Sequence, residues 1–578
     1  MQAREVYQQW MQDPYFDEET KRELQGIEKD ETEITERFYK ELEFGTAGLR
    51  GILGAGTNRM NAYTVRKATQ GLANYINRVG TGAQGVAIAY DSRHRSDEFA
   101  LEAALCLTAN GIKAYVFDSL RPTPELSYAV RSLHCTAGIN ITASHNPSNY
   151  NGYKVYWADG AQITPPHDAG IMDEVKAITD YSNVKTMDEQ EARDQGLLVT
   201  IGKELDDAYL DELKKQVLHP EVIKEMADQV SIVYTPLHGT GNIPVRRLLE
   251  ELGFSNVFVV KEQEKPDGDF PTVSYPNPES REAFELGLKL AKEKHADLVL
   301  ATDPDADRLG VYVLDRSSGE YIPLTGNMSG CLLAEYVISQ KKELQGLPKD
   351  GALIRSIVTT HMADAIAKAY GIELVEVLTG FKYIGQKMLE FETTGKGTYL
   401  FGLEESYGCL PGTYARDKDA VAATMLLCEA AAFYKKQGKT LWDAMMSMYE
   451  TYGCFLDDVA SVTLEGKEGL EKIASIMDRL HKEDVESIGA FKVLGIRDYL
   501  TGSRKDLLTG KSEPISLPAS NVMYYELENN AWVCVRPSGT EPKIKLYFGV
   551  WDQKMDKAKE LAAQLKQDAQ VLLGETEK

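Results

Sequence analysis

The chain has 578 residues, of which 43% are hydrophobic and 26% charged, and its formal net charge is -24 at pH 7. A chain of this length is too long to fold around one hydrophobic core, so we expect several domains. The negative charge argues against nucleic acid or an anionic membrane as a partner, but a small anionic substrate needs only a few cations gathered in one site.

Alternating strand and helix patterns occur three times in succession along the chain. Each unit has a strand, a helix, a glycine and a second strand, and continues through a further helix into a third strand. Gly111, Gly253 and Gly371 stand where a left-handed residue would end a helix. In the first unit the strand, the helix and the second strand are predicted at residues 86–90, up to 110 and 112–117. They are predicted at residues 230–234, 243–252 and 257–260 in the second unit, and at 353–358, 362–370 and 372–377 in the third.

The third strand of each unit ends at an unusual polar loop. These loops are residues 142–145, 302–308 and 402–408. Because α/β sheets place their chemistry at the carboxyl ends of strands, three such loops in equivalent positions predict one shared cleft.

The last part of the chain has a different pattern. Strands are predicted at residues 522–526, 532–535 and 544–550, followed by an amphipathic helix over residues 552–573. We interpret this part as an α+β domain. The predicted fold class is therefore α/β, with three similar mixed α/β domains around a central cleft and a C-terminal α+β domain. The predicted domains are residues 1–205, 206–325, 326–450 and 451–578.

Ser144 is presented in a turn between an apolar strand and a proline. Residues 137–141 have a strand pattern, and Pro147 can continue neither a strand ladder nor a helix. Turns at strand ends are where nucleophiles are displayed. The alternative is an ordinary turn, because Ser, His, Asn and Pro favour turns for local reasons. His145 is the histidine most suited to a functional role because it adjoins Ser144.

Asp303, Asp305 and Asp307 alternate after an apolar strand. In an extended backbone every second side chain points the same way, so we expect the three carboxylates on one side. Such a cluster needs a cation, and all-oxygen ligands select Mg²⁺, Mn²⁺ or Ca²⁺. An EF-hand is excluded because Arg308 and Leu314 stand where that loop needs glycine and glutamate. Asp307 also stands where an aspartyl phosphatase motif needs Thr or Val, so an acidic surface turn is the remaining alternative.

Two later loops contain residues suited to binding a phosphate group or sugar hydroxyls. Residues 536–542 join two predicted strands with a guanidinium, two hydroxyls and a glycine, which suits phosphate binding, although a bare hairpin turn is the alternative. Residues 402–408 contain carboxylates and a hydroxyl that suit hydrogen bonding to sugar hydroxyls. A glycosidase pair is disfavoured, because adjacent residues such as Glu404 and Glu405 point to opposite faces of an extended segment.

The cysteines and the apolar runs of the chain indicate in which cellular compartment the protein is expected. Seven scattered cysteines without a Cys-x-x-Cys pair argue against a disulfide framework and a zinc site. The longest apolar runs are shorter than the roughly 18 residues of a membrane helix, and residues 1–7 show no signal-peptide pattern. We therefore expect a soluble, cytoplasmic protein with reduced cysteines.

Together and in this order, these segments resemble the α-D-phosphohexomutases, and specifically the long phosphoglucomutase/phosphopentomutase-like type of the phosphoglucomutase/phosphomannomutase branch. The resemblance covers nearly the whole chain and implies four domains around a cleft. The segments that carry it are residues 44–51, 142–147 with 151–154, 303–308, 402–408 and 536–542.

The resemblance also implies roles for individual residues. Ser144 is the expected phosphoserine, and one Mg²⁺ is expected on Asp303, Asp305, Asp307 and a phosphoserine oxygen. Catalytic roles in charge compensation or proton transfer are expected from His145, Lys154, Arg50 and Lys418. Substrate contacts are expected from Arg308, Thr379, Glu404, Glu405, Ser406, Lys418, Arg536, Ser538, Gly539 and Thr540.

The implied activity is that of a phosphoglucomutase, an isomerase that interconverts α-D-glucose 1-phosphate and glucose 6-phosphate through glucose 1,6-bisphosphate, which also acts as activator. Sugar phosphates are the expected partners, and the protein is expected to be a monomer or homodimer. Phosphoglucosamine mutases carry a Gly-Glu-Gln-Ser-Gly-His type segment, from which Glu405 and Tyr407 depart.

Other activities stay open on the sequence. A loop that holds the 3- and 4-hydroxyls cannot read the 2-position, so phosphomannomutase or phosphopentomutase activity remains an alternative with the same mechanism. A Mg-dependent sugar phosphatase, with water as the acceptor, and a sugar-phosphate-binding regulator are less favoured.

Overall fold

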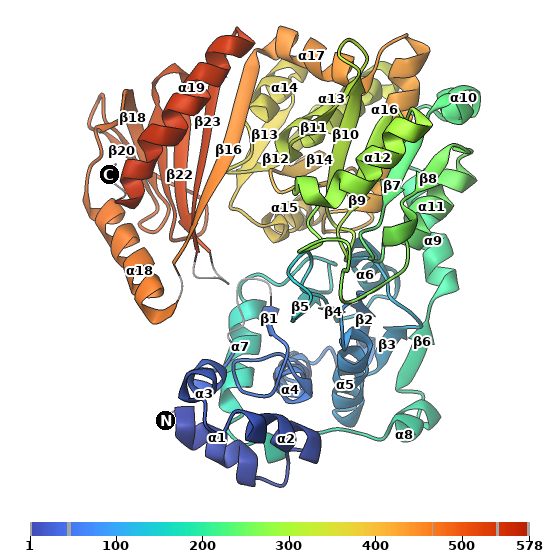
Figure 1. Ribbon diagram of the computed structural model, residues 1–578, viewed down its shortest axis with the longest axis vertical. Coiled ribbons are helices and arrows are strands. Elements are labelled where there is room, and N and C mark those ends of the chain that lie inside the picture. The colour runs from blue at the N-terminus through green and yellow to red at the C-terminus, as the bar shows by residue number, and fades with distance from the viewer. Residues whose placement is uncertain (1–2, 43–47, 465, 539–542, 575–578) are drawn as a thin grey trace. The chain divides into compact units, whose positions relative to one another are not determined.

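The computed structural model describes residues 3–42, 48–464, 466–538 and 543–574 (Figure 1). The chain divides into two compact units. Unit 1 comprises residues 1–326, 381–396 and 406–440, and unit 2 comprises residues 327–380, 397–405 and 441–578. Among the helices of the described residues, none is both long enough and apolar enough to span a membrane.

The first sheet of unit 1 is mixed, with strand order β1-β5-β4-β2-β3-β6. Strands β2, β3, β4 and β6 are parallel, whereas β5 runs antiparallel to both β4 and β1. The antiparallel β5 follows β4 directly, so the turn between them lies at the carboxyl edge of the parallel strands. The strands are β1 (Gly48–Ile52), β2 (Val86–Tyr90), β3 (Ala114–Phe117), β4 (Ala137–Ile141), β5 (Tyr150–Trp157) and β6 (Leu198–Ile201).

Helices cover both faces of this sheet because the central strands are apolar on both sides. In β2, Val86 and Ile88 join the hydrophobic core that includes the buried sides of α4 and α5, whereas Ala87 and Ala89 join the core formed with α6. This alternation is the two-residue period of a strand. The surrounding helices are α4 (Ala62–Val79), α5 (Ser96–Ala109), α6 (Thr123–Ser132), α7 (His167–Ala177) and α8 (Glu189–Asp194).

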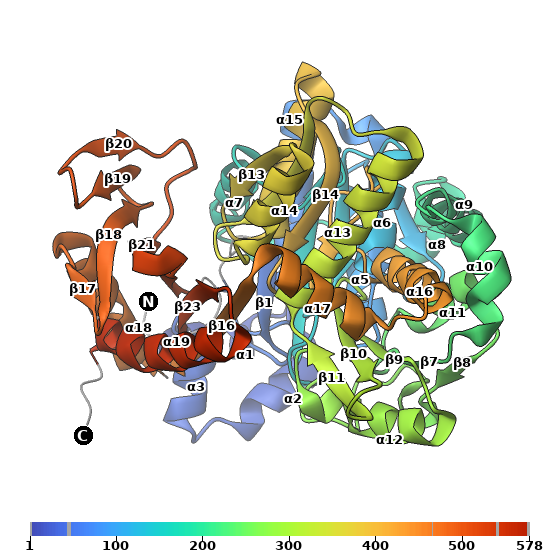
Figure 2. The same ribbon diagram turned by 90° about the horizontal axis from the view of Figure 1, so that it is seen from above.

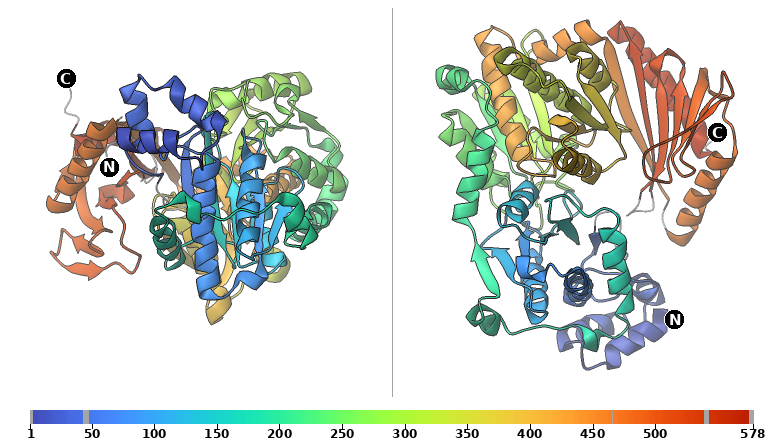
Figure 3. Two further views of the ribbon diagram at one scale, coloured as in Figure 1. Left: turned by 90° about the horizontal axis from the view of Figure 1, so that it is seen from below. Right: turned by 180° about the vertical axis from the view of Figure 1, so that it is seen from behind.

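Three N-terminal helices lie beside α4 (Figure 3). A cluster of buried side chains, most of them aromatic, joins these helices to α4. The rings of Trp10 and Phe16 stack at 4.0 Å, and the ring of Tyr63 on α4 packs edge-on to Phe16 at 4.8 Å. The helices are α1 (Ala3–Gln12), α2 (Glu18–Gly26) and α3 (Glu31–Phe38).

The second sheet of unit 1 repeats the layout of the first. Its order is β11-β10-β9-β7-β8, with β7, β8 and β9 parallel and β10 antiparallel to β9. The turn between β9 and β10 therefore corresponds to the turn between β4 and β5. The strands are β7 (Ile232–Thr235), β8 (Val257–Val259), β9 (Leu298–Thr302), β10 (Leu309–Asp315) and β11 (Glu320–Leu324), and the helices are α9 (Lys203–Lys214), α10 (Pro220–Met226), α11 (Asn242–Glu251) and α12 (Glu285–Lys294).

Helix α16 (Ala420–Lys436) of unit 1 is buried along most of its length. Every residue from 420 to 432 is buried, as expected for a helix that is apolar all round. Asp419 caps its N-terminus by accepting a hydrogen bond from the amide of Ala422. Residues 416–418 immediately precede this cap. Helix α15 (Phe381–Thr394) and strand β15 (Gly408–Leu410) also belong to unit 1.

Unit 2 contains a parallel sheet and an antiparallel sheet. Strands β12 (Gly351–Ser356), β13 (Glu373–Val377) and β14 (Thr398–Glu404) are parallel. Helices α13 (Gly326–Gln345), α14 (Met362–Tyr370) and α17 (Leu441–Tyr452) accompany them. Strand β14 continues through Glu404, so the loop predicted at residues 402–408 begins three residues later than expected.

The C-terminal part of unit 2 is an antiparallel sheet with helices on one face (Figure 2). Met477 and Leu480 of α18 and Leu565 of α19 form one core with inward residues of the sheet. The elements in sheet order are β16 (Cys454–Thr463), β23 (Lys543–Asp552), β22 (Trp532–Pro537), β21 (Met523–Leu527), β18 (Phe491–Asp498), β19 (Ser503–Asp506) and β20 (Ser512–Pro514), with β17 (Ser487–Ile488), α18 (Gly466–Lys482) and α19 (Met555–Asp568) beside them.

The predicted alternation of strands and helices is confirmed. Gly111, Gly253 and Gly371 have φ values of 75°, 96° and 66°, so each adopts the left-handed conformation expected after its helix. Strands β3 and β7 each begin two residues later than predicted. The mixed α/β class of the first three domains and the α+β class of the last are confirmed.

Candidate active site

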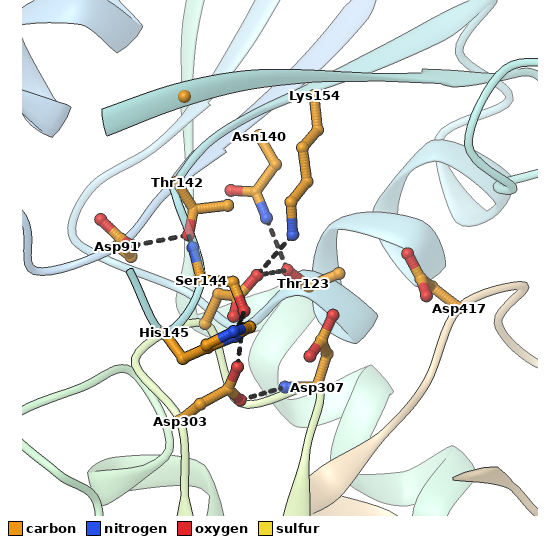
Figure 4. Close-up of polar contacts among 12 residues, drawn as sticks. Asp91, Thr123, Asn140, Thr142, Ser144, His145, Lys154, Asp303, Asp307 and Asp417 are labelled. Atoms are coloured by element: carbon orange, nitrogen blue, oxygen red, sulfur yellow. Dashed lines mark hydrogen bonds and ion pairs between the residues drawn. The ribbon is translucent and has the colours of Figure 1, made fainter. Parts of the chain in front are cut away.

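Ser144 lies in the turn between β4 and β5, where the sequence placed it (Figure 4). Its side chain is buried, and its φ of 52° is left-handed. Its Oγ donates a hydrogen bond of 2.8 Å to Oδ2 of Asp303, and Nδ1 of His145 lies 3.1 Å from the same Oγ. The serine of the first loop therefore contacts the acidic loop directly.

The three aspartates gather in a turn, not in an extended segment. Ala306 has a φ of 50°, and the backbone amides of Asp307 and Arg308 donate to Oδ1 of Asp303 at 3.1 and 3.0 Å. The predicted extended backbone is wrong, because Asp303 closes the turn with its own side chain. The carboxylates still meet: one oxygen from each of Asp303, Asp305 and Asp307 lies within 4.8 Å of the others.

This cluster has the properties of a cation site. Oδ1 of Asp305 and Oδ1 of Asp307 are buried and lack a hydrogen-bond partner among the described residues. Burial, together with the charge of Asp305, raises the pKa of Asp303 and of Asp307. Burial opposes ionisation of Asp305 as well, but the ammonium group of Lys154 holds the pKa of Asp305 below its usual value. A bound divalent cation would offset this repulsion and use the unpartnered oxygens.

Two lysines each form an ion pair with a different aspartate of the cluster. Lys154 of β5 places Nζ 2.8 Å from Oδ2 of Asp305, and Lys418 places Nζ 3.0 Å from Oδ2 of Asp307. Lys418 also lies 3.0 Å from Oδ1 of Asp417. Both ammonium groups are therefore held beside the carboxylates and near Ser144.

Three further predicted residues lie around this centre. Arg50 of β1 donates from Nη1 to Oδ1 of Asn146 at 3.2 Å, which places it at the turn of Ser144, and residues 44–47 of its predicted loop lie outside the described residues. Arg308 pairs with Glu279 at 2.7 Å. Burial, with the nearby charges of Arg308 and Arg50, lowers the pKa of His145, so its imidazole is neutral at neutral pH.

The sequence did not single out the residues that support this centre. Oγ1 of Thr123, at the start of α6, donates to Oδ2 of Asp305 at 2.8 Å, and Nδ2 of Asn140 donates to Oγ1 of Thr123 at 2.7 Å. Asp91 and Arg93 follow β2 and contact the turn of Ser144. The strand-end rule that located Ser144 applies equally to residues after β2 and β3, and would have found Thr123, Asp91 and Arg93.

Thr379, Glu404 and Glu405 lie at strand ends of unit 2. Oγ1 of Thr379, after β13, is buried and has no hydrogen-bond partner among the described residues. Oε1 of Glu404 accepts a hydrogen bond of 2.8 Å from the amide of Gly380, while Oε2 of Glu405 lies 3.1 Å from Oγ of Ser356. Glu404 and Glu405 thus have separate partners. Ser406, in the turn after them, belongs to unit 1.

The predicted phosphate loop follows β22 in unit 2. Arg536 stands opposite Lys545 in the β22–β23 pair, and the amide of Ser538 donates to the carbonyl of Lys543 at 2.7 Å. Strands β22 and β23, which flank the predicted loop, are therefore antiparallel neighbours. Gly539 and Thr540 lie outside the described residues, and the phosphate-binding role of the loop stays a prediction.

Sequence profiles of the phosphoglucomutase/phosphomannomutase family match the chain in four places. The α/β/α domains I, II and III match residues 41–182, 207–316 and 325–452, and the C-terminal domain matches residues 509–567. These matches cover more than half of the chain and run in the family order.

Similar proteins agree with the profiles. A phosphoglucomutase of Staphylococcus saprophyticus is 39% identical over 529 residues, covering 91% of this chain and 93% of the relative. One of Staphylococcus aureus is 38% identical over 538 residues, covering 92% and 93%.

Two solved structures share the fold. A phosphoglucomutase/phosphomannomutase family protein of Burkholderia thailandensis has a TM-score of 0.64 at 18% identity and covers 92% of this chain and 97% of its own. The open form of parafusin, a phosphoglucomutase from Paramecium, has a TM-score of 0.68 at 18% identity, covering 93% and 97%. The chain belongs to the phosphoglucomutase/phosphomannomutase family of the α-D-phosphohexomutase superfamily.

Proposed function

We propose that this protein is a phosphoglucomutase that interconverts α-D-glucose 1-phosphate and glucose 6-phosphate through a phosphorylated Ser144 and glucose 1,6-bisphosphate. The observation that carries the proposal is the 2.8 Å hydrogen bond from Oγ of Ser144 to Asp303 in a cluster of three buried aspartates. The names of the staphylococcal relatives support glucose as the sugar.

The reaction needs a phosphoryl carrier that gives up its group and takes it back. In the first step the bond between phosphorus and Oγ of Ser144 breaks while the 6-hydroxyl oxygen of glucose 1-phosphate bonds to phosphorus. The hydroxyl proton passes to a base, and Oγ takes up a proton. In the second step Oγ of Ser144 gives up its proton and bonds to the phosphorus of the 1-phosphate, while the bond from that phosphorus to the 1-oxygen breaks. Glucose 6-phosphate leaves with the proton returned to its 1-hydroxyl.

Asp303, Asp305 and Asp307 would hold one Mg²⁺, together with an oxygen of the phosphoserine. The all-carboxylate donor set and the unpartnered oxygens of Asp305 and Asp307 fit this hard cation. When bound, Mg²⁺ neutralises charge on the phosphate oxygens and so makes phosphorus more open to attack.

Cationic side chains around Ser144 would complete the charge balance. Lys154 and Lys418 lie 2.8 and 3.0 Å from the aspartates, and Arg50 contacts Asn146 in the turn of Ser144. Each can stabilise the transferring phosphoryl group without entering a covalent step. Lys154, His145 and Lys418 are, in that order, our candidates for the proton transfers.

Substrate binding must serve two orientations of the same sugar. Glu404 and Ser406 would bind sugar hydroxyls, with Glu405, Thr379, Arg308 and Lys418 as further contacts. Oγ1 of Thr379 is buried and unpartnered among the described residues, which suits a group that waits for a ligand. The non-reacting phosphate would bind Arg536, Ser538, Gly539 and Thr540 in either orientation.

Further expectations concern the working enzyme. Glucose 1,6-bisphosphate would act as activator by phosphorylating Ser144 in protein that has lost its phosphate. We expect a cytoplasmic monomer or homodimer, with the four domain boundaries of the sequence analysis.

The test is an assay of the purified protein with Mg²⁺ and a trace of glucose 1,6-bisphosphate. We expect conversion of glucose 1-phosphate to glucose 6-phosphate, with kcat/KM higher than for the 1-phosphates of mannose, glucosamine and ribose measured side by side. Ser144→Ala should lose both turnover and protein-bound phosphate. Wild-type turnover by this variant would show that Ser144 is not the phosphoryl carrier.

Other outcomes distinguish the alternatives. A higher kcat/KM on mannose or ribose phosphate would indicate a phosphomannomutase or phosphopentomutase. Release of inorganic phosphate without glucose 6-phosphate would indicate a phosphatase, and binding without turnover would indicate a regulator.

A further inference from the structure

Both backbone polar groups of Ser144 are held by side chains. Its amide donates a hydrogen bond of 2.8 Å to Oγ1 of Thr142, and its carbonyl accepts one of 2.5 Å from Nη2 of Arg93. All three residues are buried, with exposed fractions of 1% for Thr142 and 3% for Arg93 and Ser144. The backbone of Ser144 is thus fixed from two directions before any substrate binds.

Arg93 holds more of the turn than Ser144 alone. Its Nη2 also donates to the carbonyl of Asn146, and its Nη1 donates to the carbonyls of Pro147 and Tyr150 at 2.8 and 3.1 Å. One guanidinium group therefore connects four carbonyls, three in the turn after β4 and one at the start of β5. The planar, forked donors of arginine make this possible, whereas a lysine ammonium offers only three donors from one atom.

Asp91 contacts both Thr142 and Arg93, the two residues that hold the backbone of Ser144. Its Oδ2 accepts a 2.6 Å hydrogen bond from Oγ1 of Thr142 (Figure 4). The same oxygen lies 3.4 Å from Nε of Arg93, and Oδ1 of Asp91 accepts from the amide of Arg93 at 3.0 Å. Oγ1 of Thr142 therefore donates to Asp91 and accepts from Ser144. Burial lowers the pKa of Arg93 to about 10, so its charge persists at neutral pH.

A segment near the second sheet covers this network. The ring of Phe270 lies under the Arg93 guanidinium, with Cζ 5.0 Å from the ring centroid. Gly268 approaches the same loop so closely that a Cβ there would lie 2.8 Å from the amide nitrogen of His94. The packing keeps water from Arg93 and favours its bonds to the carbonyls.

The conformation of Ser144 needs such support. A φ of 52° is disfavoured for a residue with a Cβ, and it persists only where the surroundings determine it. We propose that Asp91, Thr142 and Arg93 are positioning residues that hold Ser144 in this conformation and so aim Oγ at Asp303. This inference rests on the proposed function, in which Ser144 carries the phosphoryl group.

The positioning has a consequence for the choice of acceptor. A sugar hydroxyl bound at one place needs the phosphorus in line, and a misplacement of about 1 Å can reduce transfer about 10²-fold. Water is small and mobile, so it attacks a displaced phosphoserine with little such loss. Weakening the network should therefore shift the phosphoryl group from sugar to water.

The test compares Thr142→Val with Thr142→Ser. Valine keeps the shape of threonine but loses the oxygen that contacts Ser144 and Asp91, whereas serine keeps that oxygen. Ser144 is labelled with radioactive glucose 1,6-bisphosphate, and the label is then followed into sugar phosphate and inorganic phosphate after addition of glucose 6-phosphate. This ratio is taken per labelled protein, so a loss of folded protein does not change it.

We expect Thr142→Val to lower kcat about 10²-fold and to raise the share of label released to water, with Thr142→Ser close to wild type. Arg93→Lys should behave like Thr142→Val. Its matched control is Arg95→Lys, because Arg95 lies in the same loop but is exposed and pairs with Glu98 at 3.0 Å. If Arg93→Lys does not fold, the Thr142 pair decides.

The outcomes separate this inference from the proposed function. A wild-type ratio and kcat in Thr142→Val would overturn the inference, while turnover and labelling of the wild-type protein would keep the proposed function. Wild-type protein that neither takes up label nor turns over would overturn both.

Discussion

The ammonium group of Lys154 lies 2.8 Å from Oδ2 of Asp305, and both side chains are buried. The pair connects β5 of the first sheet to the turn after β9 of the second. Lys154 is ten residues after Ser144 in sequence, and the antiparallel turn of β5 returns it to the same centre. One end of the acidic cluster is therefore neutralised by a lysine of the strand that follows Ser144.

Lys154→Met should lower kcat about 10²- to 10⁴-fold, the usual effect of losing a positioned acid–base or charge-compensating group. Methionine keeps the length of the side chain but not its charge, and Asp305 is left without its cation. The measurement is kcat/KM for glucose 1-phosphate. Lys203→Met is the control because Lys203 is exposed and its ammonium group pairs with Asp207 on the surface of α9. Activity within a factor of about two of wild type would exclude Lys154 from catalysis.

Removal of divalent cations should silence the enzyme, and Mg²⁺ should restore it. Independently of activity, saturating Mg²⁺ should raise the melting temperature, because a ligand at 100 times its Kd stabilises the folded state by about 2.7 kcal/mol. Asp307→Asn removes one of the three negative charges that hold the cation and should reduce this shift. Asp211→Asn, at an exposed position of α9, should not change it. Full activity in chelator, or an unchanged shift in Asp307→Asn, would contradict the metal site.

Gly408→Ala should displace Lys418. A Cβ at Gly408 would lie 2.0 Å from Cδ of Lys418, and the φ of Gly408 is outside the left-handed region, so only the lack of space opposes alanine. We expect kcat to fall at least about tenfold, because Lys418 would leave its place beside Asp307. Gly26→Ala is the control, since a Cβ there meets no atom within 4 Å.

A double-mutant cycle checks that this effect passes through Lys418. In a Lys418→Ala background, Gly408→Ala should cause little further loss of kcat, because the clashing side chain is absent. Equal losses in both backgrounds would place the effect of Gly408 elsewhere.

The sequence predicted those parts of the fold that depend on local patterns. Strands β2 and β4 and the three glycines after helices were located because apolar runs and left-handed positions are visible in a short window. Strand β5 was not predicted. Its residues Tyr153, Lys154 and Tyr156 are buried because β5 pairs with β1 and β4, and that pairing leaves no local pattern.

In the candidate site, too, the features visible in a short stretch of sequence were predicted, whereas the contacts made in the folded chain were not. The three aspartates lie together as predicted. Their backbone was predicted as extended, because the closure of the turn depends on Asp303 accepting from two amides. The position of Arg93 after a strand was visible in the sequence, but its contacts were not, because its partners are carbonyls more than fifty residues later in the chain. A charged residue in a sequence does not show which distant carbonyls it will contact.

Asp419 should make stability depend on pH in weak acid. It is fully buried and accepts hydrogen bonds from the hydroxyls of Tyr209 and Tyr414 at 2.8 and 2.7 Å, and burial raises its pKa to about 6. The folded protein therefore keeps a proton on Asp419 over a range in which the unfolded chain, with a pKa near 3.8, has released it. Since the folded state binds more protons, the free energy of unfolding falls as pH rises through this window.

Asp419→Asn should remove this contribution. Asparagine caps helices as well as aspartate does, so the N-terminus of α16 keeps its cap. The free energy of unfolding of wild type minus that of the variant should decrease by about 2 kcal/mol from pH 4 to pH 7, since one pKa unit corresponds to about 1.4 kcal/mol and the unfolded carboxyl is already partly ionised at pH 4. Chemical denaturation of both proteins at matched pH measures the difference, with Asp211→Asn as the exposed control. A difference that stays constant over this range would show that Asp419 is ionised throughout in the folded protein.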